Sequence, residues 1–244
     1  MKKTMIIGLA IGLAMTATSA LAAGPVPGGS GIVGSYHDLG VDYADSQSRI
    51  CVFCHHPHNS IKQNTNGVGD YSPLWNHTMS AATFTTYDNG MIGKISDSSN
   101  TLNAVQGGPG GVSLLCLSCH DGTVAINAYS LTDGKPNPGA NDSALGAGTR
   151  ATIGDGGDMS NHHPIGFNYA DVAAADTEIA RIEKPMTGGG VTIGGLLYNG
   201  NMECTTCHDV HNSQNDAGAE KFLWTTNDAS AFCLVCHEKA GTKF

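Results

Sequence analysis

The chain has 244 residues and a formal net charge of −9, with 33 glycines, 6% aromatic and 14% charged residues. The acidic balance disfavours nucleic-acid binding, because phosphate backbones attract basic surfaces. The many glycines and few aromatic residues argue against long helices, large sheets and a sizeable core built by the polypeptide alone.

The amino terminus has the pattern of a signal peptide. Lys2 and Lys3 form a charged region, residues 4–16 are mostly apolar, and Ala20-Leu21-Ala22 is a small-x-small cleavage site. The apolar stretch is shorter than the roughly 20 residues that a membrane-spanning helix needs. We therefore predict a signal peptide over residues 1–22, and one exported domain over residues 23–244 that is periplasmic or extracellular. We expect no integral membrane segment in the mature chain.

Four Cys-x-x-Cys-His motifs use all eight cysteines of the chain. Two thiols at this spacing can form thioethers with one haem, and the next residue can bind its iron. Zinc knuckles, redox dithiols or four disulfides are alternatives, but none explains a histidine after every pair. We predict four covalently bound haem c groups, attached by Cys51 and Cys54, Cys116 and Cys119, Cys204 and Cys207, and Cys233 and Cys236. The proximal iron ligands are then His55, His120, His208 and His237.

The motifs form an internal repeat of two paired units, at about residues 37–130 and 200–244. In each unit the first motif has a second histidine three residues after its own, His58 or His211, and is followed by Leu-Trp, at Leu74-Trp75 or Leu223-Trp224. A Gly-rich connection joins the units, and within it residues 189–198 indicate a small hairpin.

The predicted fold class is a multihaem cytochrome c, mostly coil with short helices and few strands, folded around four stacked haems. Each haem is a large apolar plate that supplies the core that the composition lacks. We expect short helical turns after each motif and surface loops elsewhere.

Seven further histidines are candidates for the four distal iron positions. A helical continuation would place His58 and His211 one turn beyond the proximal histidines, too close to reach round their own haems, so each should bind a neighbouring haem. His37 and His163 have an adjacent Asp or Pro that can orient the imidazole. His77 and His162 remain rivals, and His56 is too near a proximal ligand. Methionines are the other possible ligands, but they more often serve packing.

The chain resembles the doubled-CxxCH cytochromes over about residues 37–237. The resemblance rests on Ser-Tyr-His37-Asp-Leu, His-Pro-His58-Asn, Pro73-Leu74-Trp75-Asn76, His120-Asp-Gly-Thr, His163-Pro-Ile-Gly-Phe and Asp-Val-His211. Within that group it is similar to the tetrahaem extracellular filament cytochromes of the OmcE type. The resemblance implies that His37, His58, His163 and His211 are the distal ligands, and it implies polymerisation.

These observations predict an electron carrier rather than an enzyme. Iron with two histidine ligands has a low potential and no open position for a substrate. We expect a subunit of an extracellular conductive filament, with a monomeric periplasmic shuttle as the alternative and a multihaem reductase as a weaker one. The expected partners are other cytochromes and redox proteins, and further copies of the chain in a head-to-tail homopolymer. In such a polymer His37 either crosses to the next subunit or folds back onto its own.

Overall fold

The computed structural model describes residues 31–42, 48–56, 58, 60, 74–87, 108–129, 144–146, 149, 151–186, 190–211 and 222–238. Short helices and one two-stranded sheet make up its regular structure, and the rest is coil, as predicted. The elements in chain order are α1 (Leu39–Asp42), η1 (Cys51–Phe53), α3 (Gly111–His120), η2 (Asp155–Gly157), β1 (Phe167–Asn168), α4 (Tyr169–Ala175), α5 (Ile193–Leu196), β2 (Asn201–Met202), α6 (Cys204–Cys207), η3 (Asp228–Ser230) and α7 (Cys233–Cys236).

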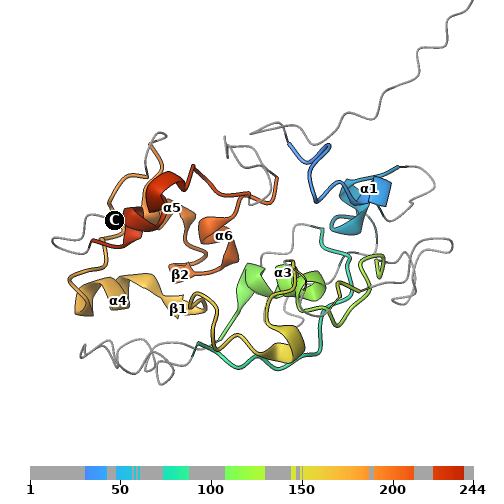
Figure 1. Ribbon diagram of the computed structural model, residues 1–244, viewed down its shortest axis with the longest axis horizontal. Coiled ribbons are helices and arrows are strands. Elements are labelled where there is room, and N and C mark those ends of the chain that lie inside the picture. Colours follow the sequence, from blue (N-terminus) through green and yellow to red (C-terminus); the bar gives the residue numbers. More distant parts are fainter. Residues whose placement is uncertain are drawn as a thin grey trace, which may run out of the picture.

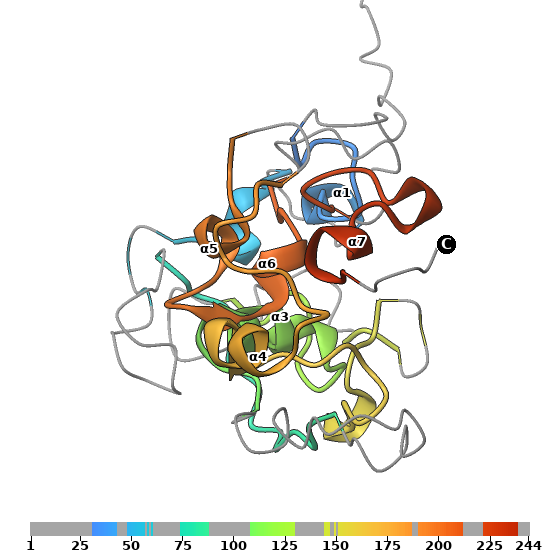
Figure 2. The same ribbon diagram turned by 90° about the vertical axis from the view of Figure 1, so that its left-hand side faces the viewer.

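The molecule is elongated, and its two halves lie at opposite ends of the long axis (Figure 1). The carboxyl-terminal half contains α4, α5, α7 and the antiparallel pair β1–β2, in which Phe167 is opposite Met202. The views in Figures 1 and 2 both place α6 beside α3, where the halves meet. The third motif therefore lies next to the second.

The largest hydrophobic cluster is in the carboxyl-terminal half and packs against the third and fourth motifs. It includes Tyr169, Ile193 and Val235, with Cys207 and Cys236 at its edge. Met186 and Met202 are buried in the same cluster, so they serve packing. Smaller clusters surround the first two motifs. One of them is centred on Phe53.

The helical turns contain the motifs instead of following them, so the prediction of turns after each motif was wrong. Each Cys-x-x-Cys stretch is itself a turn of helix, within η1, α3, α6 or α7 or ending just after it. Beyond the third and fourth motifs the chain becomes extended at once, with φ −111° and ψ 127° at His208 and φ −95° and ψ 116° at His237. His208 then pairs with Leu223 in a β-bridge, which prevents a helix from continuing.

The predicted hairpin over residues 189–198 was also wrong over its central part. Residues 193–196 form α5, and the Thr192 side chain caps it by accepting a hydrogen bond from the Gly195 N–H. Ile193 is fully buried, and this burial stabilises the helical turn.

Backbone pairing around the first and third motifs follows the same pattern. Asn76 N–H donates to the Cys54 carbonyl, and Trp224 N–H donates to the Cys207 carbonyl. Leu74 and Phe222 both have positive φ, 56° and 52°. Trp224 therefore corresponds in structure to Asn76, one position away from Trp75. The two Leu-Trp pairs match in sequence but occupy different places.

No helix in the described part of the chain is long and apolar enough to cross a membrane. The predicted signal peptide, residues 1–22, lies outside the described residues.

Candidate haem-binding site

Helical geometry brings the two cysteines of each motif onto one face. Residues three apart in a helical turn are neighbours on its surface, which is the arrangement that attachment to one flat group requires. In the first, third and fourth motifs the backbone N–H of the histidine closes the turn by donating to the carbonyl of the first cysteine. The N···O distances are 2.8 Å for His55, 3.0 Å for His208 and 3.0 Å for His237.

Burial makes several of these thiols harder to ionise. It raises the pKa of Cys54 to about 11 and that of Cys207 to about 12, and it raises the pKa of Cys119 further. All eight cysteines are free of disulfides. Within the described ranges no group of three or more His, Cys, Asp or Glu side chains is placed to hold a metal ion.

Thiols of successive motifs influence one another, so the motifs lie close together in chain order. Cys54 is near enough to raise the pKa of Cys119 electrostatically, and Cys236 acts on Cys207 in the same way. Between these pairs, a hydrogen bond joins Cys116 to Cys204; it raises the pKa of Cys116 and lowers that of Cys204. The four motifs therefore follow one another along the long axis (Figure 1).

Among the described ring contacts, three motif histidines pair with a histidine from elsewhere in the chain. The ring centres are 6.1 Å apart for His55 and His211, 5.9 Å for His120 and His37, and 6.3 Å for His237 and His163. Two imidazoles that bind one metal ion from opposite sides hold their ring centres roughly 6 Å apart, since two metal–nitrogen bonds of about 2 Å and two ring radii of about 1 Å separate them. The three pairs therefore have the spacing of axial ligands.

Backbone carbonyls orient several of these rings. Nδ1 of His120 lies 2.6 Å from the Ala151 carbonyl oxygen, and Nδ1 of His163 lies 3.0 Å from that of Pro164. His37 is hydrogen-bonded to the Val210 carbonyl. A histidine that donates one ring N–H to a carbonyl has its other nitrogen available for a metal, and such bonds are typical around metal-bound imidazoles. The acceptors of His120 and His37 come from distant segments that sequence spacing could not identify, whereas that of His163 is the next residue.

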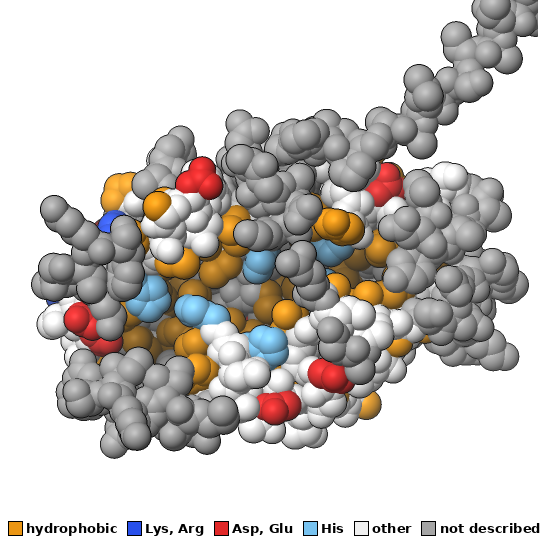
Figure 3. Space-filling view, viewed as in Figure 1, with side chains coloured by type: hydrophobic (Ala, Val, Ile, Leu, Met, Phe, Trp, Pro, Cys, Tyr) orange, Lys and Arg blue, Asp and Glu red, His pale blue; other side chains and the backbone are white. Residues whose placement is uncertain are grey.

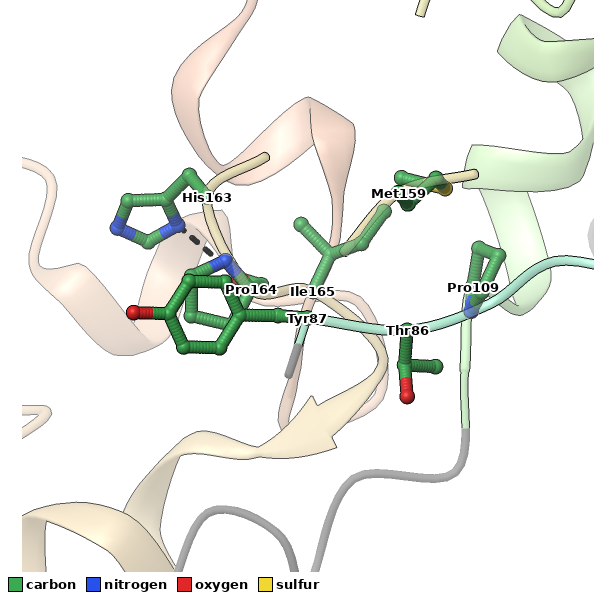
Figure 4. A pocket seen from close by; sticks show the side chains of 7 residues that line it. All are labelled: Thr86, Tyr87, Pro109, Met159, His163, Pro164 and Ile165. Atoms are coloured by element: carbon green, nitrogen blue, oxygen red, sulfur yellow. Dashed lines mark hydrogen bonds between the residues drawn. The ribbon is translucent and has the colours of Figure 1, made fainter. Parts of the chain in front are cut away.

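His163 is at the edge of a small hollow of about 170 Å³ (Figure 4). The loop of His163, Pro164 and Ile165 packs there against Tyr87 and Met159. These contacts pack the loop against its neighbours. The His163 ring itself is exposed and lies beside the ring of His237.

His37 lies among the histidines of its own chain. Its ring stacks on Phe222, with ring centres 4.7 Å apart, and it faces His120. Burial, and then the proximity of His120, lower the pKa of His37 to about 4, so its imidazole is neutral at pH 7. This is the arrangement in which His37 folds back onto its own subunit. Whether His37 binds within its own subunit or crosses to the next one in an assembly stays a prediction.

His58 is placed differently from His211. It is exposed, and its ring faces that of His56, with centres 6.5 Å apart. Its backbone and the Nδ1 atom of His56 are also hydrogen-bonded. Among the described contacts none joins His58 to a motif histidine. The predicted helical turn between His208 and His211 was wrong, because the chain at His208 is extended.

The two rival histidines are engaged elsewhere. His77 is fully buried, with Nδ1 2.9 Å from the Thr78 carbonyl oxygen and Nε2 3.0 Å from that of Ala125. His162 accepts a hydrogen bond at Nε2 from the Gly154 N–H. These contacts involve both nitrogens of His77 and only the outer nitrogen of His162.

An unpaired donor next to the first motif also fits a large cofactor. The indole Nε1 of Trp75 is buried and has no hydrogen-bond partner, while the ring lies edge-on to His55 at 6.3 Å. In contrast, Trp224 Nε1 donates to the Thr205 carbonyl. Histidines gather along the hollowed middle of one face, with hydrophobic side chains around them (Figure 3). The cysteine pairs, histidine pairs and unpaired donor together fit bound haem.

Comparison with known families bears directly on the second paired unit. Residues 198–242 match the family model of the doubled CXXCH motif. This range includes the third and fourth motifs, and the match supports a multihaem c-type cytochrome with covalently bound haem c. It indicates a role in electron transfer. No curated protein matches the chain.

Proposed function

We propose that the protein is a tetrahaem c-type cytochrome that carries electrons outside the cytoplasm. The observation that carries the proposal is the set of three histidine pairs. Each joins a motif histidine to one of the expected distal ligands at 5.9–6.3 Å. The four motifs supply attachment for four haems.

The pairs support a sixth ligand for three of the four motifs. His211 serves the iron of the first motif, His37 that of the second, and His163 that of the fourth. His58 then remains for the iron bound by His208. This assignment is supported by the repeat, because His58 follows His55 at the same interval as His211 follows His208. The first and third motifs thereby exchange distal ligands, which ties the two halves of the chain together.

Bound haem supplies a metal ion that accepts and gives up one electron at a time. With haem bound, the histidines of the chain would supply two imidazoles to each iron and would leave no position for a substrate, which favours an electron carrier over a reductase. Thiols of successive motifs lie close together, which favours close spacing of the four sites along the long axis. The thiol pairs are Cys54 and Cys119, Cys116 and Cys204, and Cys207 and Cys236.

Two assemblies are consistent with this role. The filament is supported by the resemblance of the motifs and by the exposed apolar side chains of Val33 and Tyr36, 59% and 65% exposed, beside His37. The monomeric shuttle is supported by the His37–His120 pair, since it completes the ligand set within one chain. We propose the filament, with subunits that each hold a complete ligand set.

Two measurements test the function. The intact mass of the protein purified from the periplasmic and secreted fractions should exceed the mass of the processed polypeptide by four haems; three or fewer would refute the tetrahaem assignment. Negative-stain electron microscopy of the secreted fraction should show filaments. Dispersed particles at every concentration would refute the filament and favour the shuttle.

A further inference from the structure

Glu203 is a buried carboxyl group between the second and third motifs. It directly precedes Cys204, and its side chain is 2% exposed. It is the N-cap of α6 in a capping box, in which its carboxylate accepts a hydrogen bond from the Thr206 N–H and its own N–H donates to the Thr206 hydroxyl. Glu203 is therefore fixed to the helical turn that carries the third motif.

The same carboxylate also contacts the segment that carries the second motif. The Ser113 hydroxyl donates to Oε2 of Glu203, and the Gly110 N–H points to the same oxygen at 3.5 Å. Ser113 is itself fully buried, and its hydroxyl oxygen accepts from the Cys204 N–H at 2.9 Å. Glu203 and Ser113 thus join α3 to α6 at the place where Cys116 and Cys204 meet.

The surroundings of Glu203 favour its neutral form more than those of an exposed glutamate do. Burial raises its pKa to about 7, against the opposing effect of the hydrogen bonds from Ser113 and Gly110. The titratable groups nearby are the Cys116 and Cys204 thiols, which haem attachment converts to thioethers, and Tyr198, whose ring lies against Gly111. None of the described groups that act on the Glu203 pKa is charged.

We propose that Glu203 is a redox-linked proton-binding site, which takes up a proton when the irons of the second and third motifs are reduced and releases it when they are oxidised. The inference rests on the proposed function. A one-electron donor, such as another cytochrome, supplies each electron, and water supplies the proton that the carboxylate accepts. Reduction removes a positive charge that stabilises the carboxylate, and in a buried site that loss is poorly screened. Proton uptake then restores the charge balance.

Spectroelectrochemical titration of the holoprotein between pH 5.5 and 8.5, with dithionite as reductant, tests the proposal. The midpoint potentials of part of the haem should fall as pH rises through neutrality. In Glu203→Gln, which keeps the hydrogen-bond acceptor and removes the titration, that slope should be lost. The matched control is Glu183→Gln, the same change at an exposed carboxylate, and it should keep the slope.

Two further variants guard against a simple folding defect. Glu203→Asp retains a titratable group and should retain a slope. Ser113→Ala removes a bond that favours the carboxylate and should move the slope to higher pH. An unchanged slope in a fully loaded Glu203→Gln protein would overturn the proposal and assign the pH dependence to the haem propionates. Wild-type protein with fewer than four haems would instead refute the proposed function.

Discussion

Replacement of His211 by alanine tests the ligand assignment most sharply. The His211 ring is the only imidazole that faces His55 among the described contacts, at 6.1 Å and an interplanar angle of 21°. The other ring beside His55 is Trp75, whose indole nitrogen carries a hydrogen and offers no lone pair to a metal. Among the described ring contacts of His55, none offers a second imidazole that could take the place of His211.

The expected size of the effect follows from the number of motifs. His211→Ala should leave one iron in four without its strong sixth ligand, so a quarter of the ferric iron should become high-spin. All four haems should remain attached, because the thioethers do not depend on the distal ligand. Electron paramagnetic resonance at low temperature measures the spin states, and intact mass measures attachment.

His56→Ala is the matched control for His211→Ala. His56 adjoins the same proximal ligand, but its Nδ1 contacts the backbone of His58 and the ring faces no motif histidine in the described part of the chain. This variant should stay fully low-spin. An entirely low-spin spectrum from His211→Ala, or an equal loss in His56→Ala, would show that the 6.1 Å pair is not an axial pair.

Three further predictions concern the surroundings of the sites. His37→Ala should make a quarter of the iron high-spin to the same extent at all protein concentrations; a wild-type protein that turns partly high-spin on dilution would show that the ligand comes from another subunit. Phe53→Ala removes a side chain that is 1% exposed and packs edge-on to Tyr129, and it should reduce the free energy of unfolding in denaturant by about 3–5 kcal/mol. Val33→Ala, at an exposed position, should change it by less than about 0.5 kcal/mol. Gly166→Ala should prevent correct folding around His163, as thermal unfolding will show, because a Cβ would come within 1.8 Å of the Gly108 carbonyl oxygen at a φ of +78°. Gly190→Ala has a similar φ with no atom within 4 Å, and a comparable loss there would mean that φ alone causes the effect.

The attachment chemistry could be predicted from the sequence because it is local. Cys-x-x-Cys-His fixes the identity and order of the reacting groups within five residues, and the coil-rich fold with little regular structure follows from the glycine content. The distal histidines are a long-range property. The position of His211, three residues after His208, marks it as a candidate in the sequence. The predicted helical turn was nevertheless wrong, because the β-bridge between His208 and Leu223 overrides local helix formation.

Other features depend on tertiary contacts that no short pattern contains. Trp75 and Trp224 differ by one position in the structure, because Leu74 and Phe222 hold the same place in the backbone pairing. The matching Leu-Trp pairs in the sequence conceal this difference. Similarly, the carbonyls of Ala151 and Val210 lie far in sequence from His120 and His37, the rings that they orient. Glu203 gives no signal in the sequence beyond its place before Cys204, because its burial arises only when α3 packs on α6.

The electron paramagnetic resonance spectrum of the fully oxidised wild-type protein tests the central claim most directly. Four irons that each bind two imidazoles should give only low-spin ferric signals, which integrate to four spins per chain. A high-spin signal from a quarter or more of the iron would contradict the account, because it would show an open coordination position and favour a reductase.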